Sequence, residues 1–333
     1  MYEFFESGIR GGMTFVNRHQ AARDAETELL YIDINNLYGW ALSQQLPARD
    51  FKWVVEPAEL AAIMSRPLPD ETADHGYVMQ VDLSVPAELH DRLSDLPPAP
   101  VSQCPPGSKQ KKLLLSFEPK KHYVIHSALL KFYIEELGVK VDCVHRDISF
   151  SQERVFSNYI AKNTEKRAQS TTKFKKDYYK LKNNALYGKT VENLKKRKDV
   201  RLCNNRTSFV AQSSKPTYRR CIIIKENLVA AMLNKESICL DRPVYIGQAV
   251  LDLSKLRMYR LQYVELQRYR HQFPGSKINI IAGDTDSFFL EVRGIALATQ
   301  LLPQMMRDGL LDTSNYPADS PLLYLDFLVL ICL

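Results

Sequence analysis

Residues 277–292 read Lys277-Ile-Asn-Ile-Ile-Ala-Gly-Asp-Thr-Asp-Ser-Phe-Phe-Leu-Glu-Val292, and the predicted architecture follows from this stretch. Two β-rich runs, 277–282 and 287–292, surround a Gly-Asp-Thr-Asp turn, a pattern typical of a hairpin with a polar tip. Asp284 and Asp286 are two residues apart, so in extended backbone both carboxylates point to the same face. Adjacent buried like charges are costly unless a cation neutralises them. The tip therefore predicts a Mg²⁺ site, although an isolated Asp-x-Asp is more commonly plain turn chemistry.

A third carboxylate ends another apolar run. Residues 28–33, Glu-Leu-Leu-Tyr-Ile-Asp, predict a short buried strand whose last residue is Asp33. Residues 35–45 then predict a helix that closes before Pro47. We expect Asp33 to join Asp284 and Asp286 as a metal ligand.

The other predicted elements alternate between strands and helices, which indicates an α+β fold with an antiparallel sheet. Strands are expected at 78–85 and 113–116, a strand pair at 139–150 and a strand at 244–251. Helices are expected at 123–137, 153–172, 174–187 (ending at Gly188) and 253–271.

The positive charge of the chain is concentrated in one segment. The 333 residues carry 45 Lys and Arg against 38 Asp and Glu, a net charge of +7. Residues 162–201 hold 14 basic and 4 acidic residues, a balance of +10, so the remaining chain has a balance of −3. Aromatic residues alternate with the basic ones, as at Phe174, Tyr178 and Tyr187. Such a surface suits phosphates and bases, whereas the alternative is a solvated helix face.

Composition excludes several classes of protein. Apolar residues at 45% and charged residues at 25% are ordinary for a globular chain and exclude a disordered or collagen-like one. The longest apolar run, 322–333, is too short for a membrane span, and the acidic N-terminus does not resemble a secretion signal. Six scattered cysteines without a Cys-x-x-Cys pair indicate reduced thiols. We therefore expect an intracellular protein, nuclear or cytoplasmic, without a membrane partner.

Three segments, in order, resemble the polymerase motifs of family B DNA polymerases. Asp33-Ile-Asn-Asn-Leu-Tyr-Gly39 resembles the first motif, usually Asp-x-x-Ser-Leu-Tyr-Pro. Lys180-Leu-Lys-Asn-Asn-Ala-Leu-Tyr-Gly188 resembles the second, and Ala282-Gly-Asp-Thr-Asp-Ser287 the third. Ile9-Arg-Gly-Gly12 is similar to the Tyr-x-Gly-Gly element of protein-primed members, or is a plain glycine turn. Together with residues 113–123 and 163–167, these motifs make the sequence of residues 2–323 resemble polymerases of Polinton/Maverick mobile elements and related viruses.

The resemblance implies a DNA-directed DNA polymerase that joins deoxynucleotides to a primer 3′-hydroxyl. Two Mg²⁺ ions, or Mn²⁺ in their place, would assist the transfer. The residues that the family implies are Asp33, Asp284 and Asp286 as catalytic and metal-binding carboxylates, and Lys180 as the residue facing the triphosphate. Nucleotide contacts would come from Tyr38, Asn184, Tyr187, Lys176 and Arg167, and DNA contacts from Arg10, Gly11 and Gly12.

The same resemblance implies a division of the chain and its partners. The expected segments are palm 1–48, an insertion 49–113 that would serve a terminal protein, palm 114–150, fingers 151–200, palm 201–323 and an aberrant apolar tail 324–333. The partners would be template-primer DNA, deoxynucleoside triphosphates and a terminal protein primer. We expect neither a proofreading exonuclease domain nor a thumb in these 333 residues.

Two other functions remain open from the sequence. The chain could be an inactive polymerase relic that only binds nucleic acid, because the expected thumb segment is missing. It could also be a metal-dependent nuclease that uses the same carboxylates, although this reading does not explain Tyr38, Lys180 and Tyr187.

Overall fold

The computed structural model describes residues 1–18, 27–296, 300–308, 311–312 and 329–331. The chain forms two compact units: Met1–Gly188 with Val244–Leu333, and Lys189–Pro243. The expected palm segment 201–323 is therefore divided between the two units, because residues 201–243 belong to the smaller one. The expected tail 324–333 lies outside the described residues except for 329–331.

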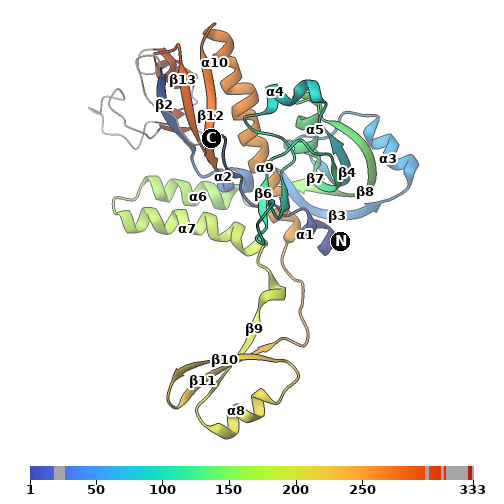
Figure 1. Cartoon of the computed structure of the whole chain (residues 1–333), viewed down its shortest axis with the longest axis vertical. Coiled ribbons are helices and arrows are strands. Elements are labelled where there is room, and N and C mark those ends of the chain that lie inside the picture. The colour runs from blue at the N-terminus through green and yellow to red at the C-terminus, as the bar shows by residue number, and fades with distance from the viewer. Residues whose placement is uncertain (19–26, 297–299, 309–310, 313–328, 332–333) are drawn as a thin grey trace. The chain divides into compact units, whose positions relative to one another are not determined.

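The larger unit contains a six-stranded sheet that includes the predicted hairpin (Figure 1). Its strands, in spatial order, are β1 (Thr14–Val16), β12 (Lys277–Asp284), β13 (Ser287–Arg293), β2 (Thr27–Ile34), β15 (Val329–Ile331) and β14 (Leu311–Asp312). The first four strands pair antiparallel, as predicted, whereas β15 pairs with β2 in parallel. The hairpin and the strand that ends near Asp33 are thus confirmed.

Alternation of side chains gives this sheet one apolar face and one polar end. Leu30, Ile32 and Ile34 of β2 are buried together with Phe288 and Leu290 of β13. Because successive residues of a strand point to opposite faces, Asp33 lies on the face away from Ile32 and Ile34. Burial of the apolar face therefore leaves the carboxylate accessible.

A second, four-stranded antiparallel sheet follows the order β3, β8, β4, β7. The strands are β3 (Leu46–Val54), β8 (Lys140–Glu153), β4 (His75–Ser84) and β7 (Lys120–His126). The expected boundary at 113 falls within this sheet, because β3 and β4 lie before it while β7 and β8 lie after it. Residues 139–150 form one long strand instead of the predicted pair, because the polar residues in its middle continue the ladder and do not turn. Likewise β7 occupies the start of the helix predicted at 123–137, and α5 (Ser127–Glu135) begins only after it.

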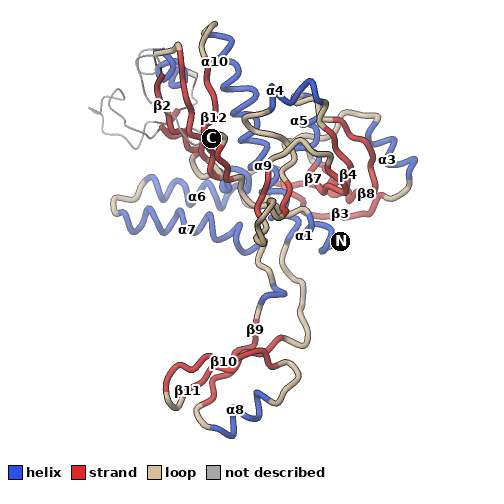
Figure 2. The backbone as a smooth tube through the Cα atoms, viewed as in Figure 1, coloured by secondary structure: helices blue, strands red, loops and turns tan. Residues whose placement is uncertain are grey.

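A long buried helix, α9 (Val244–Arg260), packs against α1 (Tyr2–Ser7), α2 (Leu37–Leu42) and α5. It continues through a π-helical turn, Leu261–Glu265, into α10 (Leu266–Gln272), as Figure 2 shows in blue. The predicted strand at 244–251 is wrong. Nearly every side chain of α9 is buried, so its apolar run has no polar face, and periodicity cannot distinguish such a helix from a strand.

The basic segment begins with two helices, α6 (Ser157–Ala168) and α7 (Lys173–Thr190). Helix α6 is shorter than predicted because β8 extends to Glu153, and α7 continues past Gly188 instead of ending there. The remaining elements of the larger unit are α3 (Pro57–Met64), η1 (Ala87–Leu89), α4 (His90–Leu93), β5 (Val101–Gln103), β6 (Lys112–Leu114) and α11 (Leu302–Arg307). In the described part of the chain, no helix is both long and apolar enough to cross a bilayer.

The smaller unit has a three-stranded sheet in the order β10, β11, β9 and its own small core. Its elements are η2 (Leu194–Lys196), β9 (Lys198–Cys203), α8 (Arg206–Ser213), β10 (Tyr218–Lys225) and β11 (Leu228–Asn234). The core consists of Cys203, Ala231 and Leu233, against which Phe209 and Tyr218 pack. The unit is thus held together independently of the larger core.

A buried carboxylate in β8 makes the stability of the fold depend on pH. Asp147 is fully buried, and neither of its oxygens has a hydrogen-bond partner among the described residues. Burial raises its pKa to about 7 from the ordinary 3.8. Because the folded pKa is the higher one, the folded state favours the protonated form, and stability falls as pH rises from about 4 to about 7.

Asp147→Asn should therefore stabilise the protein at pH 8, by up to about 4 kcal/mol for a shift of roughly three pKa units. The gain should shrink towards zero at pH 4, where the native carboxyl is already neutral. Urea unfolding of both proteins at pH 4, 6 and 8 measures this difference, with the exposed Asp142→Asn on the same strand as control. A gain of equal size at all three pH values would contradict the assignment.

Candidate active site

The sheet register brings the three candidate carboxylates to one end of the sheet. Asp33 near the end of β2 pairs with Ser287, the first residue of β13. Asp284 is the last residue of β12, and Asp286 lies in the turn between β12 and β13. Segments about 250 residues apart in the sequence are therefore neighbours through backbone pairing alone.

Backbone hydrogen bonds hold the turn against β2. Thr285 has a positive φ of 56°, and the Asp286 N–H donates to the carbonyl of Asp284 at 2.6 Å. The Ile34 N–H donates to the carbonyl of Asp286 at 2.8 Å. The position of Asp286 relative to Asp33 is thus fixed by the main chain.

The two half-buried carboxylates repel each other. Burial, and then the neighbouring Asp286, raise the pKa of Asp33 to about 6, and Lys180 opposes this shift. Burial also raises the pKa of Asp286, with Asp284 adding to the increase and Lys180 again opposing it. Lys180 therefore lies near enough to act on both acids.

Asp284 is placed differently from the other two acids. It is exposed, and its Oδ1 accepts hydrogen bonds from Thr14 Oγ1 at 2.8 Å and Thr285 Oγ1 at 3.2 Å. Among the described residues, the three carboxylates do not bring one oxygen each within 4.8 Å of one another. Asp286 therefore acts electrostatically on Asp33, and the exposed Asp284 acts on Asp286.

The donor set fits a divalent cation with a preference for oxygen. Asp33 and Asp286 offer carboxylate oxygens and are partly desolvated, and each raises the energy of its ionised neighbour. Such a pair is stabilised by bound Mg²⁺, which binds through one or two carboxylates and completes its shell with water or phosphate.

Helix α7 carries the second motif and part of the basic segment before it. Lys180, Lys176 and Asn184 are exposed on it, and Arg167 is half-buried in the last turn of α6. The neighbouring Asn183 is buried and accepts a hydrogen bond from Asn163 of α6 at 3.0 Å. This pair ties α6 to α7, a role that the two adjacent asparagines at 183 and 184 do not by themselves indicate.

Two tyrosines from different motifs stack on each other. Tyr38 of α2 and Tyr187 of α7 have ring centroids 4.4 Å apart and an interplanar angle of 20°. Burial raises the pKa of Tyr38, with Asp286 and Asp284 contributing next, so its hydroxyl lies near the acids. The structure therefore joins the first and second motifs through an aromatic contact that sequence spacing could not show.

The Arg-Gly-Gly element lies against the acidic turn, but its arginine is engaged within the protein. The Arg10 guanidinium donates to the carbonyl of Val124 at 2.8 Å and lies 3.7 Å above the ring of Tyr123. This use differs from the predicted DNA contact, since a buried ring occupies the guanidinium face. Gly11 is exposed with open space around it, whereas Gly12 lies against Thr285.

Sequence reasoning missed the residues that support the turn. Thr14 donates to Asp284, and the carbonyl of Met13 accepts from the Thr285 N–H at 2.8 Å. Strand β1 pairs Thr14 with Asp284 in register. The only sequence signal was the position of these residues directly after the two glycines.

Comparison with known proteins gives one family and several related folds. A family model described as DNA polymerase type B, organellar and viral, matches residues 1–264. Phi29 DNA polymerase complexed with primer-template DNA and incoming nucleotide substrates aligns with a TM-score of 0.55 and 17% identity, covering 91% of this chain and 45% of that chain. An orthorhombic crystal form of phi29 DNA polymerase gives a TM-score of 0.51 and 17% identity, with coverages of 88% and 43%.

Phi29 DNA polymerase complexed with single-stranded DNA gives a TM-score of 0.51 and 16% identity, with coverages of 91% and 44%. The chain thus spans less than half the length of these solved polymerases, and the likeness concerns the fold. No curated protein matches the chain.

The close approach of Gly12 to the acidic turn can be tested by a matched pair of variants. A Cβ at Gly12 would lie 2.5 Å from Thr285 Oγ1 and 2.9 Å from its Cβ, whereas a Cβ at Gly11 meets no atom within 4 Å. Gly12→Ala should lower the free energy of unfolding by about 1–3 kcal/mol through overpacking. Gly11→Ala should change it by less than about 0.5 kcal/mol. Denaturant unfolding measures both, and equal losses would show that Gly12 is not in contact with the turn.

Proposed function

This chain belongs to the family of organellar and viral type B DNA polymerases, and we propose that it extends a DNA primer on a DNA template by adding deoxynucleotides. The observation that supports this most directly is the pair Asp33 and Asp286 at adjacent strand ends, with Lys180 acting on both. A nuclease would use similar carboxylates, but it would need neither the cationic helix nor the stacked tyrosines.

The proposed reaction is an in-line displacement at the α-phosphate of a deoxynucleoside triphosphate. The primer 3′-oxygen forms the new phosphorus–oxygen bond, its proton leaves, and the bond to pyrophosphate breaks. When bound, two Mg²⁺ ions, or Mn²⁺, would lower the pKa of the primer hydroxyl and neutralise developing charge. Asp33 and Asp286 would hold the ions, with Asp284 as a supporting carboxylate. Lys180 would neutralise the charge that grows on the leaving pyrophosphate, and Lys176 and Arg167 would add weaker attraction.

The stacked tyrosines would shape the nucleotide site. Tyr38 would lie under the incoming sugar, where a 2′-hydroxyl would collide with the ring. Tyr187 and Asn184 would contact the nascent base pair from α7. Since Tyr187 stacks on Tyr38, it would also hold that ring in place.

Template-primer DNA would be bound through its backbone. The exposed basic residues of α7 and the open Gly11 would approach phosphates without reading sequence. Because its motifs resemble those of protein-primed polymerases, we also propose that the chain uses a terminal protein as primer. It would act in the replication of a mobile element or virus. Removing residues 49–113 would not test the terminal protein, because it would delete β4 from the middle of its sheet.

The alternative proposal is an inactive relic that binds nucleic acid without extending it. The departures from the usual motifs favour it: Ala282 stands where the family usually has Tyr, and Ala185 where it has Ser. Gly39 replaces the usual Pro, and a Cβ there would collide with the side chain of Asn36, which itself has a positive φ of 54°. Asn36 and Gly39 are therefore a compatible pair.

Primer extension with Mg²⁺ separates these functions. Asp286→Asn should reduce the rate of primer extension by roughly a thousandfold or more. The substitution removes the charge of a metal ligand while keeping a side chain of nearly the same size. The exposed Glu59→Gln on α3 removes a carboxylate far from the motifs in sequence and should leave the rate unchanged.

Three outcomes are distinguishable in that assay. Extension by the parent chain and Glu59→Gln, but not by Asp286→Asn, supports synthesis. Duplex binding without extension by any protein supports the relic, and carboxylate-dependent degradation of the DNA supports the nuclease.

The sugar contact of Tyr38 has its own test. Tyr38→Ala should lower the preference for a deoxynucleotide over the matching ribonucleotide by roughly 10–100-fold, because it removes the blocking ring. Tyr38→Phe keeps the ring and its stacking on Tyr187, and should retain the preference. The ratio of kcat/KM for the two nucleotides measures the effect. An unchanged ratio in Tyr38→Ala would place the discrimination elsewhere.

A further inference from the structure

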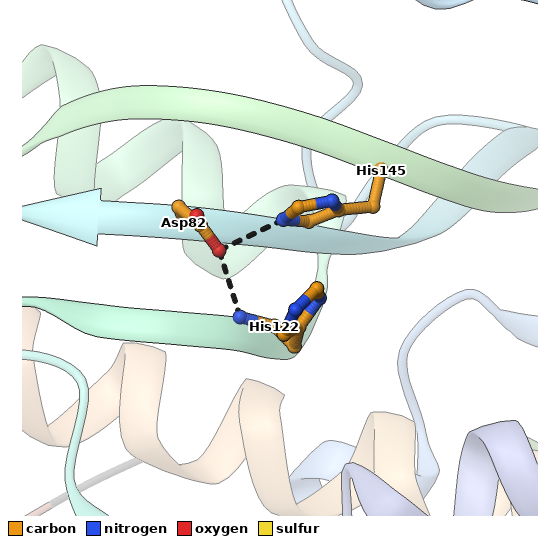
Figure 3. A group of neighbouring side chains, drawn as sticks. All are labelled: Asp82, His122 and His145. Atoms are coloured by element: carbon orange, nitrogen blue, oxygen red, sulfur yellow. Dashed lines mark hydrogen bonds and ion pairs between the residues drawn. The ribbon is translucent and has the colours of Figure 1, made fainter.

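A cluster of potential metal ligands lies on the four-stranded sheet, apart from the candidate active site. Asp82 of β4, His122 of β7 and His145 of β8 each offer one ligand atom, and these atoms lie within 4.8 Å of one another (Figure 3). The three strands are neighbours, with β4 in the middle. One ligand therefore comes from each of three adjacent strands.

Both histidines occupy irregular positions of their strands. On β8, the register passes from Arg146 opposite Gln80 to Val144 opposite Val81, so His145 is an extra residue. On β7, Tyr123 lies opposite Val81 and Lys120 opposite Leu83, so Lys121 and His122 together face Asp82. A β-bulge of this kind redirects a side chain. Two bulges, one on each side of β4, thus place both histidines beside the same carboxylate, which His145 contacts through its ring and His122 through its backbone N–H.

The backbone at His122 is also unusual for its residue type. Its φ is +51°, a left-handed conformation that costs energy in residues other than glycine. The conformation lets the His122 N–H donate to Asp82 Oδ1 at 2.8 Å. The ring of His122 lies against that of His145, with centroids 4.1 Å apart.

The carboxylate of Asp82 is ionised and held in place. The His122 N–H, the His145 ring and the Lys121 ammonium together hold the pKa of Asp82 well below its ordinary value. His145 Nε2 lies 2.8 Å from Oδ1, whereas Lys121 Nζ lies 2.9 Å from Oδ2. Lys121 thus contacts Oδ2 of Asp82, whereas the two histidines contact Oδ1.

We propose that Asp82, His122 and His145 bind a transition-metal ion, with Zn²⁺ as the ion that the donor set fits best. Two imidazole nitrogens and one carboxylate oxygen are ligands that Zn²⁺ accepts, and solvent supplies the remaining position. Imidazole nitrogen disfavours Mg²⁺, so this site differs in ion preference from the carboxylates of the candidate active site. Asp82 is 6% exposed while His122 is exposed and His145 half-exposed, so the ion can enter from solvent.

The bound ion would act as a cross-link between β7, β4 and β8. It would stabilise the folded state because the unfolded chain does not hold the three ligands together. The ammonium of Lys121 would oppose binding by its charge. Removing that charge should strengthen binding, an effect that a plain ion pair between Asp82 and His145 does not predict.

Zinc titration calorimetry on the full chain without a polyhistidine tag tests the proposal. Millimolar Mg²⁺ in the buffer occupies sites that prefer oxygen ligands. The parent chain should bind one Zn²⁺ that His145→Gln weakens by at least roughly a hundredfold, since a direct ligand matters more than its supporting partners. Lys121→Gln should bind several-fold more tightly. His75→Gln, which removes a histidine from the same strand as Asp82 but outside the cluster, should bind like the parent.

Thermal unfolding provides a second readout. At a hundredfold excess of Zn²⁺ over its dissociation constant, Tm of the parent should rise by roughly 5 °C, and a chelator should reverse the rise. The same rise in His145→Gln, or weaker binding in Lys121→Gln, would overturn the proposal. Absence of any binding by the parent chain would leave the cluster as an ion pair and likewise overturn it.

Discussion

The central constraint on this molecule is the repulsion between Asp33 and Asp286. Backbone pairing holds these two residues at one end of the six-stranded sheet despite that repulsion. Two partly desolvated neighbouring carboxylates raise each other's energy, and Lys180 opposes the resulting rise in the pKa of both. The surrounding structure must supply the stability that this arrangement costs. It does so with the buried face of the sheet, where Ile32, Ile34 and Phe288 lie directly behind the acids.

The support of the acidic turn is built from the N-terminal segment and the buried helix α9. Met13 and Thr14 bond to the turn, and Gly12 lies against Thr285. This segment is in turn held by Lys255 of α9, whose Nζ donates to the carbonyl of Arg10 at 2.7 Å. Burial lowers the pKa of the Lys255 ammonium to about 8, although the neighbouring Asp252 opposes this shift. Charged residues inside the core thus position the backbone around the candidate active site.

The two candidate metal sites of this chain differ in ligand chemistry and therefore in the ion that each would prefer. Hard carboxylate oxygens at the sheet end suit Mg²⁺ together with phosphates, whereas imidazoles on the four-stranded sheet suit Zn²⁺. The first site uses regular strand ends and a turn, and the second uses bulges. In both, the side chains come from strands that lie far apart in the sequence.

The sequence by itself determined the hairpin, the strand before Asp33 and the basic helix of Lys180, because local alternation and turn residues specify them. It misassigned α9 and the continuous β8, since a fully buried helix has no polar face and Asp147 looks like a turn residue while being buried. Only the tertiary structure decided that Tyr38 stacks on Tyr187, that Arg10 packs on Tyr123 and that two bulges direct histidines to Asp82. These contacts join residues remote in sequence, and strand register and packing, which no local pattern encodes, bring them together.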